Sequence, residues 1–181
     1  MCVRHDAHGY APRVRDDLVA GGSFPDLHLP DHSGAHRQLR SLVDDTPTVL
    51  NFYRGWWCPK EQRFFRNLLL LQDEMEVAYT RIVSVTVDPP AVTAPFRAGL
   101  GARWTFLSDE DRHVQAELDL EEPTDPLHRP YLPYTFVLEP DLRIRSAYNG
   151  YWFWGRPTNE ELRQDLRDVM RRTRSDWDAQ A

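Results

Sequence analysis

A cysteine stands where a β-rich run meets the start of a helix. The residues from Phe52 to Glu61 read Phe-Tyr-Arg-Gly-Trp-Trp-Cys-Pro-Lys-Glu, and the proline after Cys58 suits a first helical position. Free backbone N–H groups and the positive end of a helix dipole stabilise an anion at such a place. Arg54 and Lys60 add positive charge nearby. This spacing predicts a reactive thiolate at Cys58; the alternative is a buried, inert cysteine in a packed loop.

The number of cysteines narrows the chemistry further. Two are too few for a disulfide framework or for a zinc site of four thiolates. Cys2 lies in a polar N-terminal segment, which leaves Cys58 as the candidate. Glu61 stands where a Cys-x-x-Cys motif would have its second cysteine, so dithiol exchange through this motif is excluded. A cycle at Cys58 therefore needs an external thiol reductant, unless the N-terminal segment folds over the site and brings Cys2 to it.

Composition excludes several classes of function. The chain has 181 residues, 28% of them charged, with a net charge of −6, which favours one globular domain without a basic stripe for a phosphate backbone. No uncharged apolar run approaches the ~18 residues of a membrane-spanning helix, and no signal segment opens the chain. The seven histidines show no paired metal-ligand spacing. We therefore expect a cytoplasmic protein without metal or cofactor that binds neither nucleic acid nor membrane.

Strands and helices alternate around the cysteine. Residues 48–53 and 81–87 are β-rich runs typical of buried strands, and the first is expected at the centre of a sheet. Residues 59–79 carry apolar side chains at three- and four-residue steps, which predicts a helix that begins at Cys58. The other expected elements are helices at 91–100, 109–118 and 159–172, a strand at 104–107, a hairpin of 135–139 with 143–148, and an N-terminal hairpin of 24–29 with 36–42.

This order of elements predicts an α/β fold, with a central mixed β-sheet flanked by helices on both faces and an N-terminal β-hairpin. Three prolines mark residues 121–132 as a loop. We expect an N-terminal arm at residues 1–22, one domain at 23–174 and a C-terminal tail at 175–181.

Several motifs together resemble the peroxiredoxin family, also called alkyl hydroperoxide reductase and thiol-specific antioxidant, within the thioredoxin superfamily. The sequence Cys-Pro-x-Glu follows an apolar strand that ends in Phe-Tyr. The other motifs fall in the expected order: Phe-Pro-Asp-Leu at 24–27, Ile-Val-Ser-Val-Thr-Val-Asp at 82–88, Phe-Leu-Ser-Asp at 106–109, Thr-Phe-Val-Leu-Glu-Pro-Asp at 135–141, and Gly-Arg-x-x-x-Glu-Glu-Leu at 155–162. The resemblance implies a thioredoxin-like fold and a thiol-dependent peroxidase.

The resemblance also implies roles for individual residues. Cys58 would be the peroxidatic cysteine, whose thiolate attacks a hydroperoxide and becomes a sulfenic acid. Glu61 matches the glutamate of Cys-Pro-x-Glu, and Arg156 matches an arginine that supports it, so we expect these two side chains to be ion-paired. Without the resemblance, Glu61 reads as a carboxylate that complements the helix dipole, and Arg156 as a surface arginine.

The chain departs from the family pattern at three positions. Asn51 and Gly55 stand where the family has a proline and a hydroxyl residue. Pro133 replaces the first active-site arginine, and it resembles instead the cis-proline that faces the cysteine in thioredoxins. Arg54 or Arg129 could supply the missing charge; each also reads as a structural or exposed arginine.

An aromatic run, Tyr151 to Trp154, lies between the last expected strand and the last helix. It could line an apolar peroxide pocket, contact a second copy in a homodimer, or pack in the core. The sequence thus favours a one-cysteine peroxiredoxin that reduces hydrogen peroxide or organic hydroperoxides at Cys58. Two alternatives remain: a non-catalytic thioredoxin-like binding module, and a redox sensor whose Cys58 is oxidised once and read by another protein.

Overall fold

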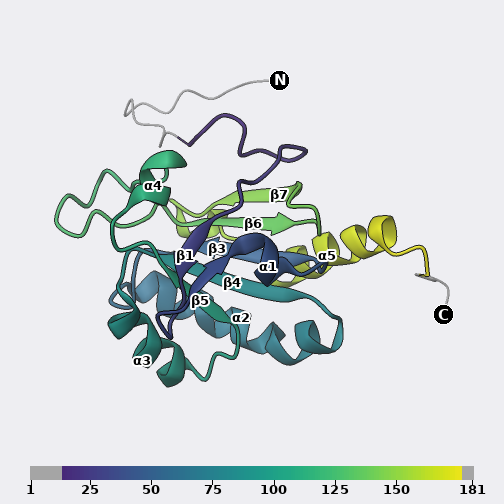
Figure 1. The fold of residues 1–181 in the computed structure, drawn as a ribbon, viewed down its shortest axis with the longest axis horizontal. Helices are drawn as coiled ribbons and strands as arrows, with labels where there is room; N and C mark the ends of the chain where they lie inside the picture. Colours follow the sequence, from purple (N-terminus) through teal and green to yellow (C-terminus); the bar gives the residue numbers. More distant parts are fainter. Residues whose placement is uncertain (1–13, 177–181) are drawn as a thin grey trace.

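A five-stranded mixed sheet forms the centre of the computed structural model, which describes residues 14–176 (Figure 1). Its strand order is β5-β4-β3-β6-β7. The parallel strands are β3 (Thr48–Phe52), β4 (Arg81–Thr86) and β5 (Thr105–Ser108); the antiparallel ones are β6 (Tyr134–Leu138) and β7 (Ile144–Asn149). A separate hairpin joins β1 (His28–Pro30) to β2 (His36–Gln38).

Strand β3 is central, as its uncharged sequence predicts. Every residue of β3 is buried, and the strand pairs with β4 on one side and β6 on the other. Successive side chains enter opposite layers of the core: Leu50 and Phe52 belong to one cluster, and Val49 and Tyr53 to the other. The loop that carries Cys58 therefore leaves the most constrained strand of the sheet.

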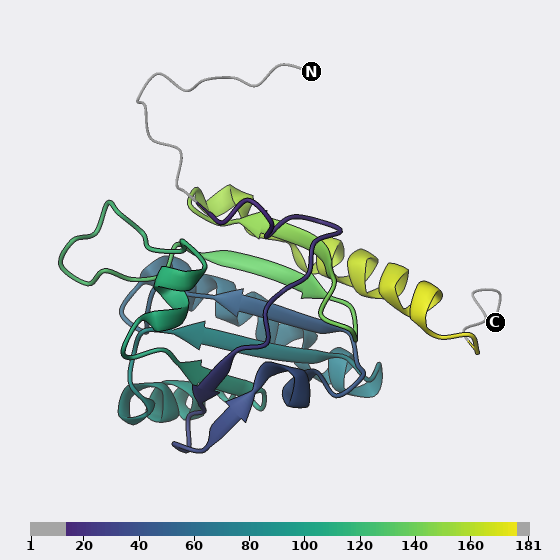
Figure 2. The same ribbon diagram turned by 45° about the horizontal axis from the view of Figure 1, so that its top comes forward.

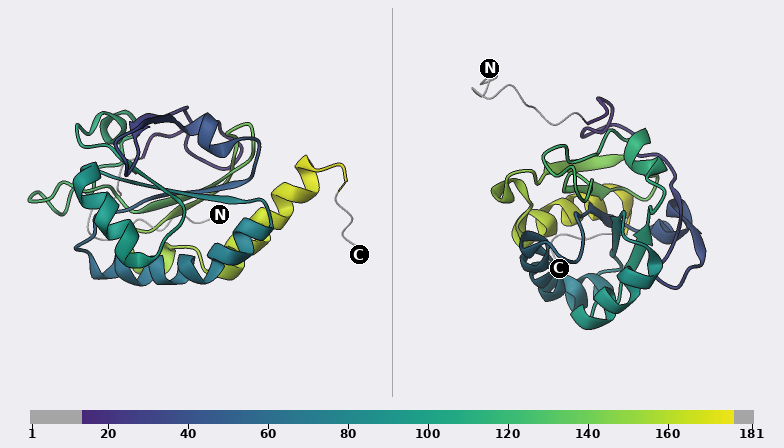
Figure 3. Two further views of the ribbon diagram at one scale, coloured as in Figure 1. Left: turned by 60° about the horizontal axis from the view of Figure 1, so that its bottom comes forward. Right: turned by 90° about the vertical axis from the view of Figure 1, so that its left-hand side faces the viewer.

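Helices cover both faces of the sheet, which confirms the expected thioredoxin-like α/β fold. One face carries α2 (Pro59–Val77), α3 (Pro90–Leu100) and α5 (Asn159–Thr173), and the other carries the β1–β2 hairpin, α1 (Leu39–Val43) and α4 (His113–Glu117) (Figure 3). A short 3-10 turn, η1 (Phe153–Gly155), precedes α5. No helix in residues 14–176 is long and apolar enough to span a bilayer.

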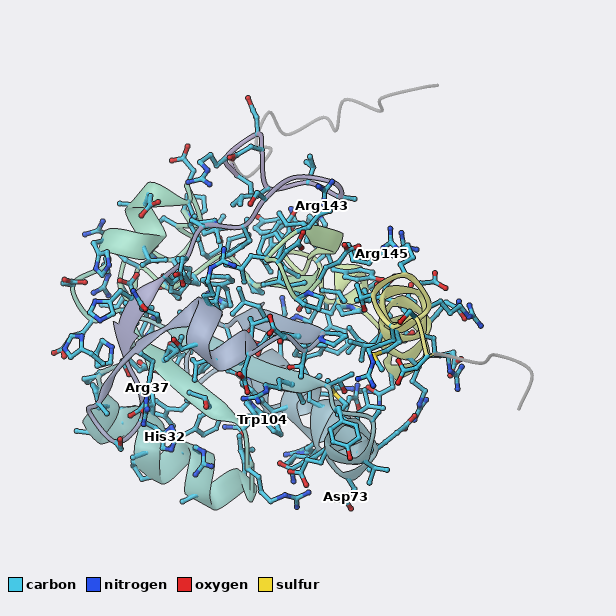
Figure 4. All side chains as sticks on the ribbon, turned by 45° about the vertical axis from the view of Figure 1, so that its right-hand side comes forward. His32, Arg37, Asp73, Trp104, Arg143 and Arg145 are labelled. Atoms are coloured by element: carbon cyan, nitrogen blue, oxygen red, sulfur yellow. The ribbon has the colours of Figure 1, made fainter. Side chains whose placement is uncertain are left out.

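Local sequence features explain why α2 and α5, the helices that position the site, form where they do. On α2, residues such as Phe65, Leu68 and Leu71 repeat at three-residue steps and are buried against the sheet. Helix α5 begins with a capping box, in which Thr158 and Glu161 satisfy each other's backbone N–H groups. Figure 4 shows Arg145 of β7 beside α5, where its guanidinium bonds the Asp168 carboxylate at 2.8 Å.

Three expected elements differ from those observed. Residues 24–27 are not strand, and residues 39–42, expected as the returning strand, form α1 because Leu39 and Val43 are buried in the core. The helix expected at 109–118 begins only at His113, since the Asp109 carboxylate accepts bonds from the N–H groups of Val114 and Gln115.

Residues before the expected domain boundary pack on the body. Leu18 is buried in the core, and Gly21 and Gly22 exchange backbone hydrogen bonds with Ile144 of β7. The proline-rich residues 121–132 form a loop without helix and with one isolated bridge, as expected, and the loop extends beside α4 (Figure 2).

Candidate active site

Cys58 is the residue that caps the start of α2. Its backbone is extended, Pro59 is the first helical residue, and the Cys58 carbonyl accepts the first helical bond, from the Gln62 N–H at 3.1 Å. The thiol is free and the residue is only 2% exposed. The expected junction of strand, short loop, cysteine and helix is thus present, with five residues between β3 and Cys58.

Glu61 and Arg156 form a buried ion pair, which confirms the pairing expected from the sequence. The two Arg156 terminal nitrogens donate to the two Glu61 oxygens at 2.7 and 3.1 Å, and Nη1 also donates to the Lys60 carbonyl at 3.2 Å. The side chains of Arg156 and Glu61 are 5% and 1% exposed. Burial raises the pKa of Glu61, and the guanidinium of Arg156 opposes that shift. The pair fixes the first turn of α2 to the segment after β7.

Two glycines and two aromatic rings place Arg156. A Cβ on Gly150 would lie 2.9 Å from Arg156 Cγ and 3.1 Å from its Nε, so only glycine leaves room for that side chain. A Cβ on Gly155 would lie 2.0 Å from the backbone oxygen of Asn149. The guanidinium also lies 5.6 Å from the ring centres of both Phe64 and Phe153. The turn between β7 and α5 is therefore built around this arginine.

Arg54 points its charge toward the 121–132 loop. Its Nη2 donates to Asp125 at 2.9 Å, and its guanidinium lies 5.2 Å from the ring centre of Trp57. Trp57 stacks on His128 at 4.1 Å, and His128 Nδ1 lies 3.0 Å from Asp125 Oδ1. These four residues tie the cysteine loop to the proline-rich loop. The sequence does not reveal Asp125 or His128, because nothing in their local pattern marks the contact.

Asp88 closes the other side of the cysteine loop. Its Oδ2 accepts from the Trp56 N–H at 3.3 Å, and burial raises its pKa against the opposing effect of this bond. Gly55 has φ of +145°, and a Cβ there would lie 2.6 Å from Trp57 Nε1 and 3.2 Å from Asp88 Oδ2. Glycine at position 55 is thus required by conformation and by space. A signal for Asp88 exists, because it follows β4, whose carboxyl end lies at the same sheet edge as that of β3.

One expectation at the site needs correction, and two alternatives left open by the sequence have an outcome. No cis peptide bond occurs in residues 14–176, so Pro133 does not resemble the thioredoxin cis-proline; its carbonyl accepts from Gly150 N at 2.8 Å, which ties the entry to β6 to the end of β7. Asn51 lies inside β3, as the strand expected at 48–53 implies; it is buried, and its side-chain oxygen accepts from the Ser84 hydroxyl at 2.6 Å. Arg129 makes two 3.0 Å bonds to exposed Glu121 instead of supplying charge to the cysteine.

A small pocket of about 120 Å³ opens beside the buried pair. Tyr151 and Trp152 of the aromatic run line it, whereas Trp154 is 91% exposed and Phe153 packs on Arg156. The remaining lining residues are Arg54, Lys60, Glu122, Thr124, Pro133 and Arg156. Of the sequence-predicted site residues, Glu61, Arg156, Arg54 and Pro133 therefore gather around the helix start that bears Cys58. Cys2 lies outside the described residues.

The arrangement favours chemistry at one sulfur. Cys58 lies at a helix N-terminus, Arg54 belongs to its loop, Arg156 bonds the first turn of its helix, and the described residues place no second thiol beside it. A thiolate there can act as a nucleophile toward a small electrophile. The Nε–H groups of Arg54 and Arg156, which have no partner among the described residues, can stabilise the negative charge of a leaving group.

Comparison of the sequence with known families gives a match to the AhpC/TSA family over residues 20–147. A protein of Mycobacterium tuberculosis named as a peroxiredoxin is 31% identical over 136 residues, which are 74% of this chain and 86% of that protein.

Solved peroxiredoxin structures share the fold. The peroxidoxin BcpB of Mycobacterium tuberculosis superposes with a TM-score of 0.72 and 24% identity, over 87% of this chain and 99% of that one. AhpC of Enterococcus faecalis gives a TM-score of 0.71 and 12% identity, over 90% and 98%. At these identities the structural likeness supports the fold, while the sequence match supports the family.

Proposed function

Because this chain belongs to the AhpC/TSA family of peroxiredoxins, thiol-dependent peroxidases, we propose that Cys58 is its peroxidatic cysteine and that the enzyme works with one cysteine. The observation that carries the proposal is the position of the only thiol in residues 14–176, at the N-terminus of α2 above the buried Glu61–Arg156 pair. The family resemblance and the local geometry indicate the same sulfur.

The first half of the reaction oxidises Cys58. The thiolate sulfur attacks the terminal oxygen of hydrogen peroxide or an organic hydroperoxide, an S–O bond forms, and the O–O bond breaks. The leaving oxygen departs as water or an alcohol after it takes a proton. Sulfur loses two electrons to the peroxide, and Cys58 becomes a sulfenic acid.

The second half needs an external thiol. Glu61 occupies the place where a resolving cysteine of a Cys-x-x-Cys motif would stand. One thiol attacks the sulfenic sulfur and releases water, which leaves a mixed disulfide on Cys58. A second thiol then releases Cys58 and forms the small-molecule disulfide, so that two thiols are consumed for each peroxide.

The surrounding residues position this sulfur. We assign Glu61 and Arg156 to holding the first turn of α2, because each is almost fully buried and their bidentate contact spans the site. Arg54 holds the loop through Asp125 and leaves its Nε without a partner among the described residues. Pro133 forms part of the pocket wall. A cytoplasmic location and a homodimer remain predictions.

Peroxide consumption by two single-cysteine variants tests the proposal. With dithiothreitol as reductant, Cys58→Ser should abolish turnover of hydrogen peroxide and of tert-butyl hydroperoxide, whereas Cys2→Ser, the matched control, should retain it. Trapping with dimedone should label one sulfenic acid, on Cys58. Turnover that survives Cys58→Ser would disprove the assignment. Equal losses in both variants would instead make Cys2 a resolving thiol and end the one-cysteine mechanism. Oxidation of Cys58 once, without turnover with any thiol, would favour the redox sensor, and no oxidation at all would favour the binding module.

A further inference from the structure

Two buried arginine donors without acceptors belong to one pocket. In residues 14–176, five buried side-chain polar atoms have no hydrogen-bond partner: Tyr53 Oη and the Nε atoms of Arg54, Arg112, Arg145 and Arg156. Of these arginines, Arg54 and Arg156 line one pocket of about 120 Å³, to which Lys60 of the first turn of α2 also contributes. The Nε of arginine can only donate, and buried donors are rarely left unpaired. The two unpartnered donors that share a pocket, those of Arg54 and Arg156, therefore favour a ligand that brings acceptor oxygens.

The residues that line the pocket indicate which chemical class of ligand it would bind. Besides the two arginines, the lining includes Lys60, for which no ion pair is found in the described residues, and one carboxylate, Glu122. Glu122 Oε1 already accepts from the N–H and hydroxyl of Thr124, at 3.0 and 2.6 Å. Arg54 and Arg156 are already ion-paired with Asp125 and Glu61, so the positive charge available to a ligand in this pocket is that of Lys60, together with the Nε–H donors of the two arginines. A planar group with two acceptor oxygens and a negative charge matches guanidinium donors best.

The position of the pocket links that group to the reaction. Arg156 donates to the carbonyl of Lys60, two residues after Cys58, so the pocket adjoins the first turn of the helix that Cys58 caps. Pro133 and the rings of Tyr151 and Trp152 form an apolar wall. A volume of about 120 Å³ accommodates a carboxylate with a short carbon chain.

We propose that this pocket is a carboxylate subsite, which holds the carboxylate of a small molecule while another of its atoms reacts at Cys58. The inference rests on the proposed function insofar as the natural molecule is either a carboxylate-bearing hydroperoxide or a carboxylate-bearing thiol reductant. The chemistry of recognition is the same for both.

Alkylation of Cys58 by iodoacetate and by iodoacetamide tests the subsite without any peroxide. The two reagents are nearly equal in size and differ by a carboxylate against an amide. The rate with iodoacetate divided by the rate with iodoacetamide would be measured on the Cys58 peptide of the full chain by mass spectrometry. We expect the ratio to exceed that of free cysteine by about tenfold, the effect of one charge-assisted bond.

Charge-removing variants distinguish an effect of the pocket's own cations on this rate ratio from an effect of the net charge of the protein. Lys60→Gln, at an exposed position that should fold normally, and Arg54→Gln should each move the ratio toward the value of free cysteine. Arg66→Gln removes one exposed positive charge elsewhere on α2 and should leave the ratio unchanged. A ratio equal to that of free cysteine, or one that Arg66→Gln lowers as much as Lys60→Gln does, would overturn the subsite.

Rates of the two half-reactions then identify the source of the carboxylate. If it belongs to the peroxide, 2-hydroperoxy-2-methylpropanoate should oxidise Cys58 faster than tert-butyl hydroperoxide does. If it belongs to the reductant, 3-mercaptopropionate should reduce the sulfenic acid faster than 2-mercaptoethanol does, per thiolate. Preference in neither half-reaction would overturn the link to the reaction. If hydrogen peroxide fails to oxidise Cys58, the proposed function fails, and the alkylation ratio still decides the subsite.

Discussion

Replacing Arg156 by methionine should leave a carboxylate buried without a counterion. Methionine keeps much of the side-chain volume and the contact with Phe64 and Phe153, so the change isolates the charge. Glu61 is 1% exposed, and both of its oxygens bond Arg156. Removing one partner of a buried pair costs about 3–5 kcal/mol, a large part of the ~5–15 kcal/mol by which domains of this kind are stable.

The cost should depend on pH in one direction. Without Arg156, burial raises the pKa of Glu61 still further, because the opposing charge is gone. A carboxyl group with a raised pKa in the folded state contributes stability below its unfolded pKa and loses it as pH rises through the folded value. The variant should therefore be most destabilised at high pH and recover part of its stability toward pH 5.

Urea unfolding at pH 5 and pH 8, followed by tryptophan fluorescence, measures this effect. The double variant Glu61→Gln with Arg156→Met should be more stable at pH 8 than Arg156→Met alone, since it removes the unpaired charge. Arg103→Met, which breaks an exposed pair with Glu76, is the control and should change the unfolding midpoint little. The reasoning is refuted if Arg156→Met costs the same free energy at both pH values and gains nothing from the second substitution.

Three further changes test other contacts. Gly150→Ala should push Arg156 aside and slow alkylation of Cys58, and a peptide-mapping rate equal to that of the native chain would contradict the 2.9 Å contact. Gly99→Ala in α3, where an added Cβ would meet no atom within 4 Å, should instead raise the free energy of unfolding by roughly 0.4–1 kcal/mol in urea titrations. Asp31 is buried, which opposes its ionisation, yet its hydrogen bonds hold its pKa at about 2. The contribution of Asp31 to stability should therefore fall by about 1 kcal/mol from pH 5 to pH 3, so that the loss measured over this range should be smaller by about that amount in Asp31→Asn.

Strand β3 and helix α2 are predicted correctly from the sequence because their burial dictates the pattern of apolar residues. Strand β3 and helix α2 have long, regular apolar patterns, so their type follows from burial alone. The Glu61–Arg156 pair was expected from the family motifs and not from spacing, since the two residues are 95 positions apart. Local pattern alone gives no reason to bring them together.

The parts that the sequence missed depend on partners distant in the chain. Residues 39–42 look like a strand, but Leu39 and Val43 reach the core only as one turn of helix. The sequence leaves open whether Arg54 supplies charge to the cysteine or has a structural role, and its pairing with Asp125 depends on where a loop of irregular backbone lies. The need for glycine at position 150 becomes visible only once Arg156 is in place.

The route of the chain through the sheet has a consequence for synthesis on the ribosome. The cysteine loop, β4 and β5 emerge first, but the second neighbour of β3 is β6, which begins at Tyr134, and Arg156 follows later still. A nascent chain that ends before β6 has its thiol and its helix, yet leaves one edge of β3 open and Glu61 without its counterion. The reactive centre is therefore completed only after β6, β7 and Arg156 have emerged, about 100 residues after Cys58.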